Sequence, residues 1–166
     1  MLKPETKKLV DAGKMLPLME AFYTIQGEGY HKGTPAYFIR VGGCDVGCHW
    51  CDVKESWDSN VHPPTAIEAI ATQAMESSDT IVVTGGEPLM WDMHPLTNLL
   101  KEKKLKTHIE TSGAYPLSGD WDWICLSPKK RKPPVSKIYS KAHELKIIVY
   151  NKSCLLYTSP SPRDPI

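Results

Sequence analysis

Residues 36–51 are Ala36-Tyr37-Phe38-Ile39-Arg40-Val41-Gly42-Gly43-Cys44-Asp45-Val46-Gly47-Cys48-His49-Trp50-Cys51. The apolar run at 36–41 predicts a β-strand. The glycine pair after it lets the chain turn, so the three thiols are expected in one loop at the strand's end. Three soft ligands at this spacing indicate a metal cluster, because three cysteines on an iron-sulfur cluster leave one iron open for an external ligand. A structural zinc site that adds His49, or three unrelated buried cysteines, are the alternatives.

The rest of the chain predicts strands that alternate with helices. Strands are expected at 18–25, 36–41, 80–84, 106–111, 123–127 and 145–150. A capping box at Thr65 and Glu68 predicts a helix over about 65–76, and an apolar stripe predicts a second helix that ends near Lys104. Apolar strands flanked by helices are typical of a parallel sheet, so we expect an α/β fold, either an open sheet or an incomplete barrel. Ligands collect at the carboxyl ends of the strands in such folds, and each motif described here is expected at such an end.

Length and composition indicate a single domain. The 166 residues carry a formal net charge of +1, and this near balance gives no sign of a nucleic-acid partner. Residues 1–17 are expected to be a polar lead-in with at most one helical turn, and residues 18–152 to be the core domain. Residues 153–166 have no period and contain three prolines, so we expect a disordered, non-native tail on a truncated core.

The terminal sequence and the cysteines bear on location. The N-terminus lacks the apolar core of a leader, and no apolar run approaches the roughly 20 residues of a membrane span. The cysteines are odd in number, and Cys125 and Cys154 lie far from the other three, which suits a reducing compartment. We therefore expect a cytoplasmic protein with no membrane partner.

A second motif, Gly85-Gly86-Glu87-Pro88, directly follows the apolar strand at 80–84. Glycine lets a ligand approach the backbone, and Glu87 offers a carboxylate to an amine, although an ordinary strand-to-helix turn could carry the same residues. A three-cysteine loop after one core strand and this motif after the next resemble the pattern of radical S-adenosylmethionine enzymes.

Further motifs limit the resemblance to one family of radical S-adenosylmethionine enzymes. Between residues 18 and 152 the chain is similar to the 7-carboxy-7-deazaguanine synthase family. The similarity is carried by residues 22–29, 37–44, 48–52, 84–88, 110–113 and 126–129. The turn Gln26-Gly27-Glu28-Gly29 is the distinguishing piece, because radical enzymes in general do not carry it. The resemblance implies an incomplete parallel β/α barrel of the radical S-adenosylmethionine type.

The resemblance also implies a reaction, that of a lyase in queuosine and 7-deazapurine biosynthesis, a tRNA modification pathway. The open iron of a 4Fe-4S cluster would bind S-adenosylmethionine, and one electron would cleave it to a 5'-deoxyadenosyl radical. This radical would abstract hydrogen from 6-carboxy-5,6,7,8-tetrahydropterin, whose ring then contracts with loss of ammonia. The family further implies Mg²⁺, a flavodoxin-like reductant and a homodimer, and we assign no side chain as a catalytic acid or base.

By the same resemblance, three sets of residues acquire roles. The cluster ligands would be Cys44, Cys48 and Cys51. S-adenosylmethionine would be contacted by Trp50, Asp52, Gly86, Ser127 and Lys129. The substrate would be contacted by Ile25, Gln26, Gly27, Arg40 and Thr84. The planar fork of Arg40 suits a carboxylate and Gln26 suits a donor-acceptor ring edge. Read alone, however, Arg40 is a surface ion-pair residue, Gln26 a turn residue and Thr84 a strand terminus.

One position departs from the family pattern. Val53 stands where the family has a threonine whose hydroxyl helps to bind Mg²⁺, so the magnesium requirement is left open. The nearest alternative function is another radical S-adenosylmethionine enzyme, such as one that generates a glycyl radical on a protein partner. A zinc-binding module without catalysis is a more remote alternative.

Overall fold

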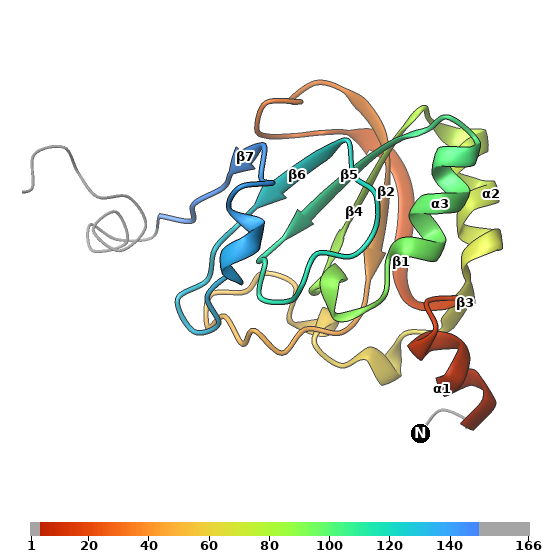
Figure 1. The fold of residues 1–166 in the computed structure, drawn as a ribbon, viewed down its shortest axis with the longest axis horizontal. Helices are drawn as coiled ribbons and strands as arrows, with labels where there is room; N and C mark the ends of the chain where they lie inside the picture. Colours follow the sequence, from red (N-terminus) through yellow and green to blue (C-terminus); the bar gives the residue numbers. More distant parts are fainter. Residues whose placement is uncertain (1–3, 150–166) are drawn as a thin grey trace, which may run out of the picture.

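A mixed β-sheet with helices on one face forms the framework of the computed structural model, which describes residues 4–149 (Figure 1). The strands are β1 (Met15–Ile25), β2 (Pro35–Val41), β3 (Pro64–Ala66), β4 (Thr80–Gly85), β5 (Lys106–Thr111), β6 (Trp123–Leu126) and β7 (Glu144–Leu145). The helices are α1 (Pro4–Asp11), α2 (Ile67–Ser77) and α3 (His94–Glu102), with 3-10 turns η1 (Lys54–Ser56), η2 (Ser59–Val61), η3 (Pro88–Met90) and η4 (Ser136–Ile138).

The sheet has the order β3-β1-β2-β4-β5-β6-β7, and its two edges do not pair within the described residues. The strands from β2 to β7 run parallel, whereas β1 is antiparallel to both β2 and β3. The predicted incomplete barrel is confirmed. The expectation of a parallel sheet is wrong for β1, which is antiparallel to its neighbours. The connection at 26–34 is short, so β1 and β2 form a hairpin, whereas parallel neighbours need a longer crossover.

The two faces of the sheet differ in what covers them. Side chains alternate along a strand, so Ile39 and Ile109 lie in the main core while their neighbours Arg40 and Glu110 face the other way. The main core also contains apolar residues of α2 and α3, which cover this face. The opposite face has only a small apolar cluster built on Ala36, Phe38 and Val82 and is otherwise polar. We call it the open face.

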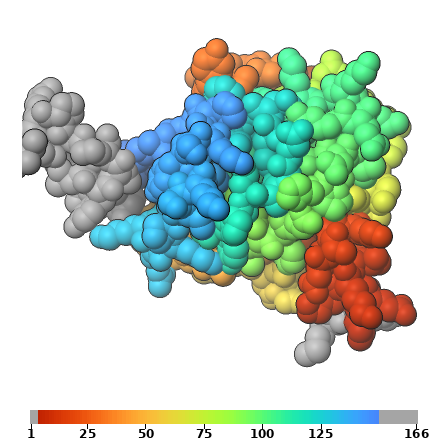
Figure 2. Space-filling view, in the orientation of Figure 1, coloured from red at the N-terminus to blue at the C-terminus, as the bar shows by residue number. Residues whose placement is uncertain are grey.

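The N-terminal segment is more ordered than its composition indicates. The expectation of at most one helical turn in residues 1–17 is wrong, because α1 spans eight residues and β1 begins at Met15. Val10 of α1 and Leu16 of β1 are both buried. Gly13 reverses the chain between them with a φ of 66°, a conformation that glycine adopts without strain. In the space-filling view, α1 and the segment that ends at residue 149 lie on opposite sides of the surface (Figure 2).

Two further element boundaries differ from the sequence-based expectations. The capping box is wrong: Thr65 belongs to β3 and its hydroxyl donates to the Pro63 carbonyl, so α2 starts at Ile67 without a side-chain cap. The strand expected at 145–150 is shorter, since β7 ends at Leu145. Its partner β6 ends at Leu126, and Pro128 beyond it has no N–H to continue the ladder. The tail expected at 153–166 lies outside the described residues.

No helix among residues 4–149 has the length and apolar character needed to cross a membrane.

Candidate active site

Two cavities that share part of their walls lie on the open face and at the carboxyl ends of the parallel strands. The larger has a volume of about 500 Å³ and the smaller about 220 Å³. The residues that line both are Asp52, Thr84, Gly85, Glu110 and Lys146. Two ligands held in these cavities would therefore meet along a common border.

The three-cysteine loop forms one wall of the smaller cavity. Cys44, Cys48 and Cys51 all line it as half-buried free thiols. The start of the loop is fixed by backbone hydrogen bonds, because the Gly43 N–H donates to the Ser56 carbonyl at 2.7 Å and its own carbonyl accepts from Glu87 N–H at 2.8 Å. A Cβ at Gly86 would overlap that same Gly43 carbonyl, so glycine lets the two loops lie directly against each other.

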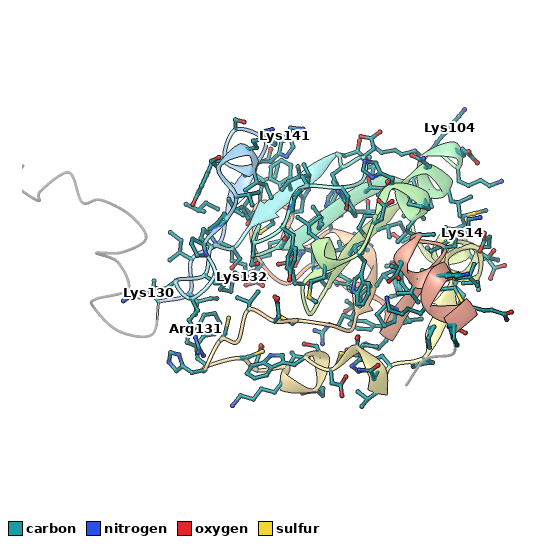
Figure 3. The ribbon with its side chains drawn as sticks, turned by 60° about the horizontal axis from the view of Figure 1, so that its bottom comes forward. Lys14, Lys104, Lys130, Arg131, Lys132 and Lys141 are labelled. Carbon is teal, nitrogen blue, oxygen red and sulfur yellow. The ribbon has the colours of Figure 1, made fainter. Side chains whose placement is uncertain are left out.

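The basic run Lys129-Lys130-Arg131-Lys132 contacts the cysteine loop. Arg131 Nη1 donates to the Gly47 carbonyl at 2.8 Å, and Lys132 Nζ pairs with Asp45 at 2.6 Å (Figure 3). The hydrogen bond from Lys132 lowers the pKa of the Asp45 carboxyl. Lys129 lies over the Trp50 ring, 5.5 Å from its centroid. Three residues of this run therefore contact the loop that carries the thiols.

The thiols are partly buried, and two cationic side chains lie near one of them. Burial raises the pKa of Cys44 and Cys48, and the positive charges of Lys129 and Arg131 oppose this rise at Cys48. Among residues 4–149, no group of three or more His, Cys, Asp or Glu side chains is arranged to hold a single metal ion. Three thiols on the wall of one cavity are the ligands that an iron-sulfur cluster takes, with each thiolate on a separate iron.

The residues expected to contact S-adenosylmethionine are brought together. Trp50, Asp52, Gly86, Ser127 and Lys129 all line the smaller cavity with the cysteines. The Lys129 ammonium donates to the Ser127 carbonyl at 2.7 Å and to its hydroxyl at 2.6 Å. Burial lowers the pKa of Lys129. The cavity thus offers a cation and hydroxyl groups beside the thiols.

Glu87 has a structural task that the sequence did not reveal. Its buried carboxylate accepts hydrogen bonds from Leu89 N–H at 3.0 Å, from the Thr111 hydroxyl at 2.5 Å, and from the backbone and hydroxyl of Ser112. Four accepted bonds account for the lone pairs of a carboxylate. Glu87 therefore ties the loop after β4 to the end of β5, which differs from the expectation that it stands free to meet an amine.

The residues expected to contact the substrate are also brought together. Ile25, Gln26, Gly27, Arg40 and Thr84 all line the larger cavity. Arg40 Nη1 pairs with Glu20 at 2.9 Å, which is the surface ion pair that a reading of the residue alone favoured. The guanidinium carries five N–H donors, so a single pairing with Glu20 leaves others for the cavity.

The turn at 26–29 reaches the site by an unexpected route. Because β1 is antiparallel to the core strands, this turn starts at the opposite end of the sheet from the cysteine loop, contrary to the expectation that all motifs lie at carboxyl ends. It then folds across the open face, where Tyr30 stacks on Trp123 and His31 contacts His108, with ring centroids 5.0 and 4.5 Å apart. Figure 1 shows this connection between β1 and β2 reaching toward β7.

Two charged residues of the site had no assigned role. Glu110 accepts from Gln26 Nε2 at 3.0 Å and from the Thr84 hydroxyl at 3.3 Å, and it lines both cavities. The Lys146 ammonium hydrogen-bonds to Glu28 and lies 3.8 Å from Glu110. Burial opposes the charge of Lys146, but these carboxylates raise its pKa. The available signal was a lone charge in an apolar run, Leu145-Lys146-Ile147-Ile148.

Comparisons with known proteins agree with this geometry. Residues 38–126 match the Radical SAM superfamily. A 7-carboxy-7-deazaguanine synthase from Flavobacterium psychrophilum is 64% identical over 157 residues, which cover 95% of this chain and 75% of that protein. The chain belongs to the 7-carboxy-7-deazaguanine synthase family. A synthase from Synechocystis is 51% identical over 80% of this chain and 64% of its own length.

Membership of the 7-carboxy-7-deazaguanine synthase family is matched by the fold. The crystal structure of QueE from Escherichia coli superimposes with a TM-score of 0.78 and 30% sequence identity, covering 94% of this chain and 79% of that one. Members are lyase-type radical S-adenosylmethionine enzymes, so the family implies a 4Fe-4S cluster and S-adenosylmethionine.

Proposed function

We propose that this synthase converts 6-carboxy-5,6,7,8-tetrahydropterin into 7-carboxy-7-deazaguanine with loss of ammonia. The observation that carries the proposal is the pair of cavities with a shared border. One contains three thiols, and the other contains an arginine and a glutamine suited to a carboxylated ring. The relatives' shared name supports the product, and queuosine or another 7-deazapurine is its proposed destination.

The smaller cavity is the proposed site of the cluster and S-adenosylmethionine. Cys44, Cys48 and Cys51 would hold the cluster, which leaves one iron open to an external ligand. When bound, the two groups together supply one-electron reduction and hydrogen-atom abstraction. The other wall residues would contact S-adenosylmethionine, and they are Trp50, Asp52, Gly86, Ser127 and Lys129. Lys129 also keeps a positive charge beside the thiol of Cys48, which favours the thiolate.

The larger cavity is the proposed pterin site. Arg40 would pair with the substrate carboxylate through donors that Glu20 does not use. Gln26, with the neighbouring backbone at Ile25 and Gly27, would match the donor-acceptor edge of the pterin ring. Thr84 lies on the border with the smaller cavity, so it would contact the substrate where hydrogen abstraction takes place.

Magnesium has weaker support in this chain. Val53 lines the larger cavity but has no oxygen to offer a hard cation. Any Mg²⁺ would depend on Asp52, which lines both cavities, and on substrate or water oxygens. We therefore propose that this synthase depends on Mg²⁺ less than a threonine-containing relative does.

We propose a cytoplasmic location because the four cysteines of the described residues are all free thiols, which suits a reducing compartment. A flavodoxin-like protein as the electron donor and a homodimeric state are proposals that rest on the family resemblance alone.

Anaerobic reconstitution with iron and sulfide tests the proposed reaction. The protein is incubated with dithionite, S-adenosylmethionine and 6-carboxytetrahydropterin, and the deazaguanine product is measured by mass. Arg40→Met should form less product at a low substrate concentration while it still releases 5'-deoxyadenosine without substrate, because Arg40 lines only the larger of the two cavities. A protein that releases 5'-deoxyadenosine but never forms the deazaguanine would contradict the proposed substrate and favour another radical enzyme.

A further inference from the structure

The turn Gln26-Gly27-Glu28-Gly29 must be held in place to serve the substrate cavity. Its base is fixed by the hairpin, since Gln26 N–H donates to the Thr34 carbonyl and the Gln26 carbonyl accepts from Gly33 N–H, each at 2.8 Å. Its tip at Gly27 and Glu28 lies beyond the last paired residues of β1 and β2 and crosses the open face. Its far side is anchored at residue 30, where Tyr30 N–H donates to Glu144 at 3.3 Å and the Tyr30 ring stacks on Trp123. The tip at Glu28, which also lines the larger cavity, needs a separate anchor.

Lys146 is placed to provide that anchor. Its ammonium hydrogen-bonds to Glu28 in the turn and lies 3.8 Å from Glu110 at the end of β5. Its backbone N–H donates to the Leu126 carbonyl at 2.8 Å, which fixes the residue to β6. Lys146 lines both large cavities and also a third, small one of about 20 Å³ under the turn.

The two carboxylates near Lys146 explain why a positive charge is needed at this position. Glu28 and Glu110 are like charges that both pair with one ammonium, and Glu110 also accepts a hydrogen bond from the Gln26 amide at 3.0 Å. The side chains of Lys146 and Glu110 are only 26% and 21% exposed, so water screens their attraction less than at the surface. Without the lysine, the two carboxylates repel each other and the Gln26 side chain loses a fixed partner.

We propose that Lys146 is a positioning residue for the substrate: through Glu28 and Glu110 it holds the 26–29 turn over the larger cavity and so sets the affinity for the pterin. This inference rests on the proposed function for the identity of the ligand. The position of the turn is an independent consequence and can be measured without any ligand.

The test compares Lys146→Met with Lys141→Met, a matched control with an exposed lysine five residues earlier in the same segment (Figure 3). Before the cluster is loaded, the dissociation constant for 6-carboxypterin is measured by fluorescence, and amide hydrogen exchange is measured at residues 26–29. We expect Lys146→Met to weaken binding about tenfold, as the loss of a charged hydrogen bond does, and to speed exchange in the turn. The control should match the wild type, and Lys146→Arg should recover part of the affinity.

Two results would overturn the proposal. One is wild-type affinity and wild-type exchange in Lys146→Met. The other is weaker binding with unchanged exchange at 26–29, which would mean that Lys146 contacts the ligand directly. If the wild type itself neither binds 6-carboxypterin nor forms the deazaguanine, the proposed function fails, and the exchange comparison still decides the anchoring role. Glu28→Gln, at a side chain 60% exposed, tests the same bridge if Lys146→Met does not fold.

Discussion

The covered face and the open face of the sheet are built from the same strands and yet do different work. Ile39 is fully buried against the helices, while Arg40, the next residue, lines the larger cavity. Val83 and Thr84 on β4, and Ile109 and Glu110 on β5, repeat the arrangement. Because side chains alternate along a strand, stability and binding can be divided residue by residue without separate structural elements.

The largest expected effect is a loss of function with no change in fold. Cys48→Ser removes a proposed cluster ligand outside the core, so we expect product formation to be abolished and the unfolding temperature to stay near that of the wild type. Iron content and visible absorbance after reconstitution measure the first effect, and thermal denaturation measures the second. Cys125→Ser is the matched control, since this buried thiol lies outside the loop and should leave the iron content unchanged.

A neighbouring pair of variants tests the division between the faces most directly. Ile39→Ala should destabilise the fold by about 3 kcal/mol, because it leaves a cavity in the core. Arg40→Met should change the free energy of unfolding by less than about 1 kcal/mol, since its ion pair with Glu20 is partly exposed, but it should raise the KM for the pterin. Denaturant titration and steady-state kinetics of both variants measure the difference. If both variants lost the same free energy of unfolding, the two faces would not differ in their contribution to stability.

Acid should weaken the open face at His108, which is buried under the turn beside His31 and Trp123. Burial, reinforced by His31, lowers the pKa of His108 to about 4, below its ordinary value of 6.5. Between these values the unfolded chain binds a proton that the folded chain does not, so stability falls as the pH drops below about 6.5. We expect a loss of about 2 kcal/mol between pH 7 and pH 5.

The pH effect is checked by denaturant titration of the wild type and of His108→Gln. The glutamine variant should show a smaller loss between pH 7 and pH 5, because it has no group that titrates at this position. A variant with the same pH dependence as the wild type would assign the effect to other residues.

The smallest expected effect concerns metal dependence at Val53 in the larger cavity. Val53→Thr supplies a hydroxyl to the larger cavity, so we expect the variant to be stimulated by Mg²⁺ more than the wild type is. Calorimetric titration of Mg²⁺ in the presence of 6-carboxypterin measures binding apart from activity. Equal Mg²⁺ affinity in both proteins would show that residue 53 does not determine the requirement.

Much of the sheet could be predicted, because local sequence encodes it. The strand expected at 106–111 has the bounds of β5, and those expected at 80–84 and 123–127 each differ from β4 and β6 by one residue. The cysteine loop and the Gly85-Gly86 motif could likewise be placed at strand ends, since each directly follows an apolar run.

What could not be predicted depends on contacts between distant residues. The direction of β1 depends on its pairing with β2. Thr65 lies in β3, which pairs with β1, and so it does not cap the helix that follows. Glu87 looks like a ligand group in sequence, and only the fold shows that Thr111 and Ser112 occupy its carboxylate. Lys146 gives the weakest signal, because its partner Glu28 lies 118 residues earlier.

That last separation has a consequence for the order in which the molecule assembles. The three cysteines lie in one short loop and come together as soon as that loop forms, whereas the bridge from Glu28 to Lys146 must close a chain of 118 residues. Contacts of such long range are formed at a high cost in chain entropy and only after the intervening strands have paired. On a growing chain, the thiols can therefore come together long before the wall of the larger cavity is closed.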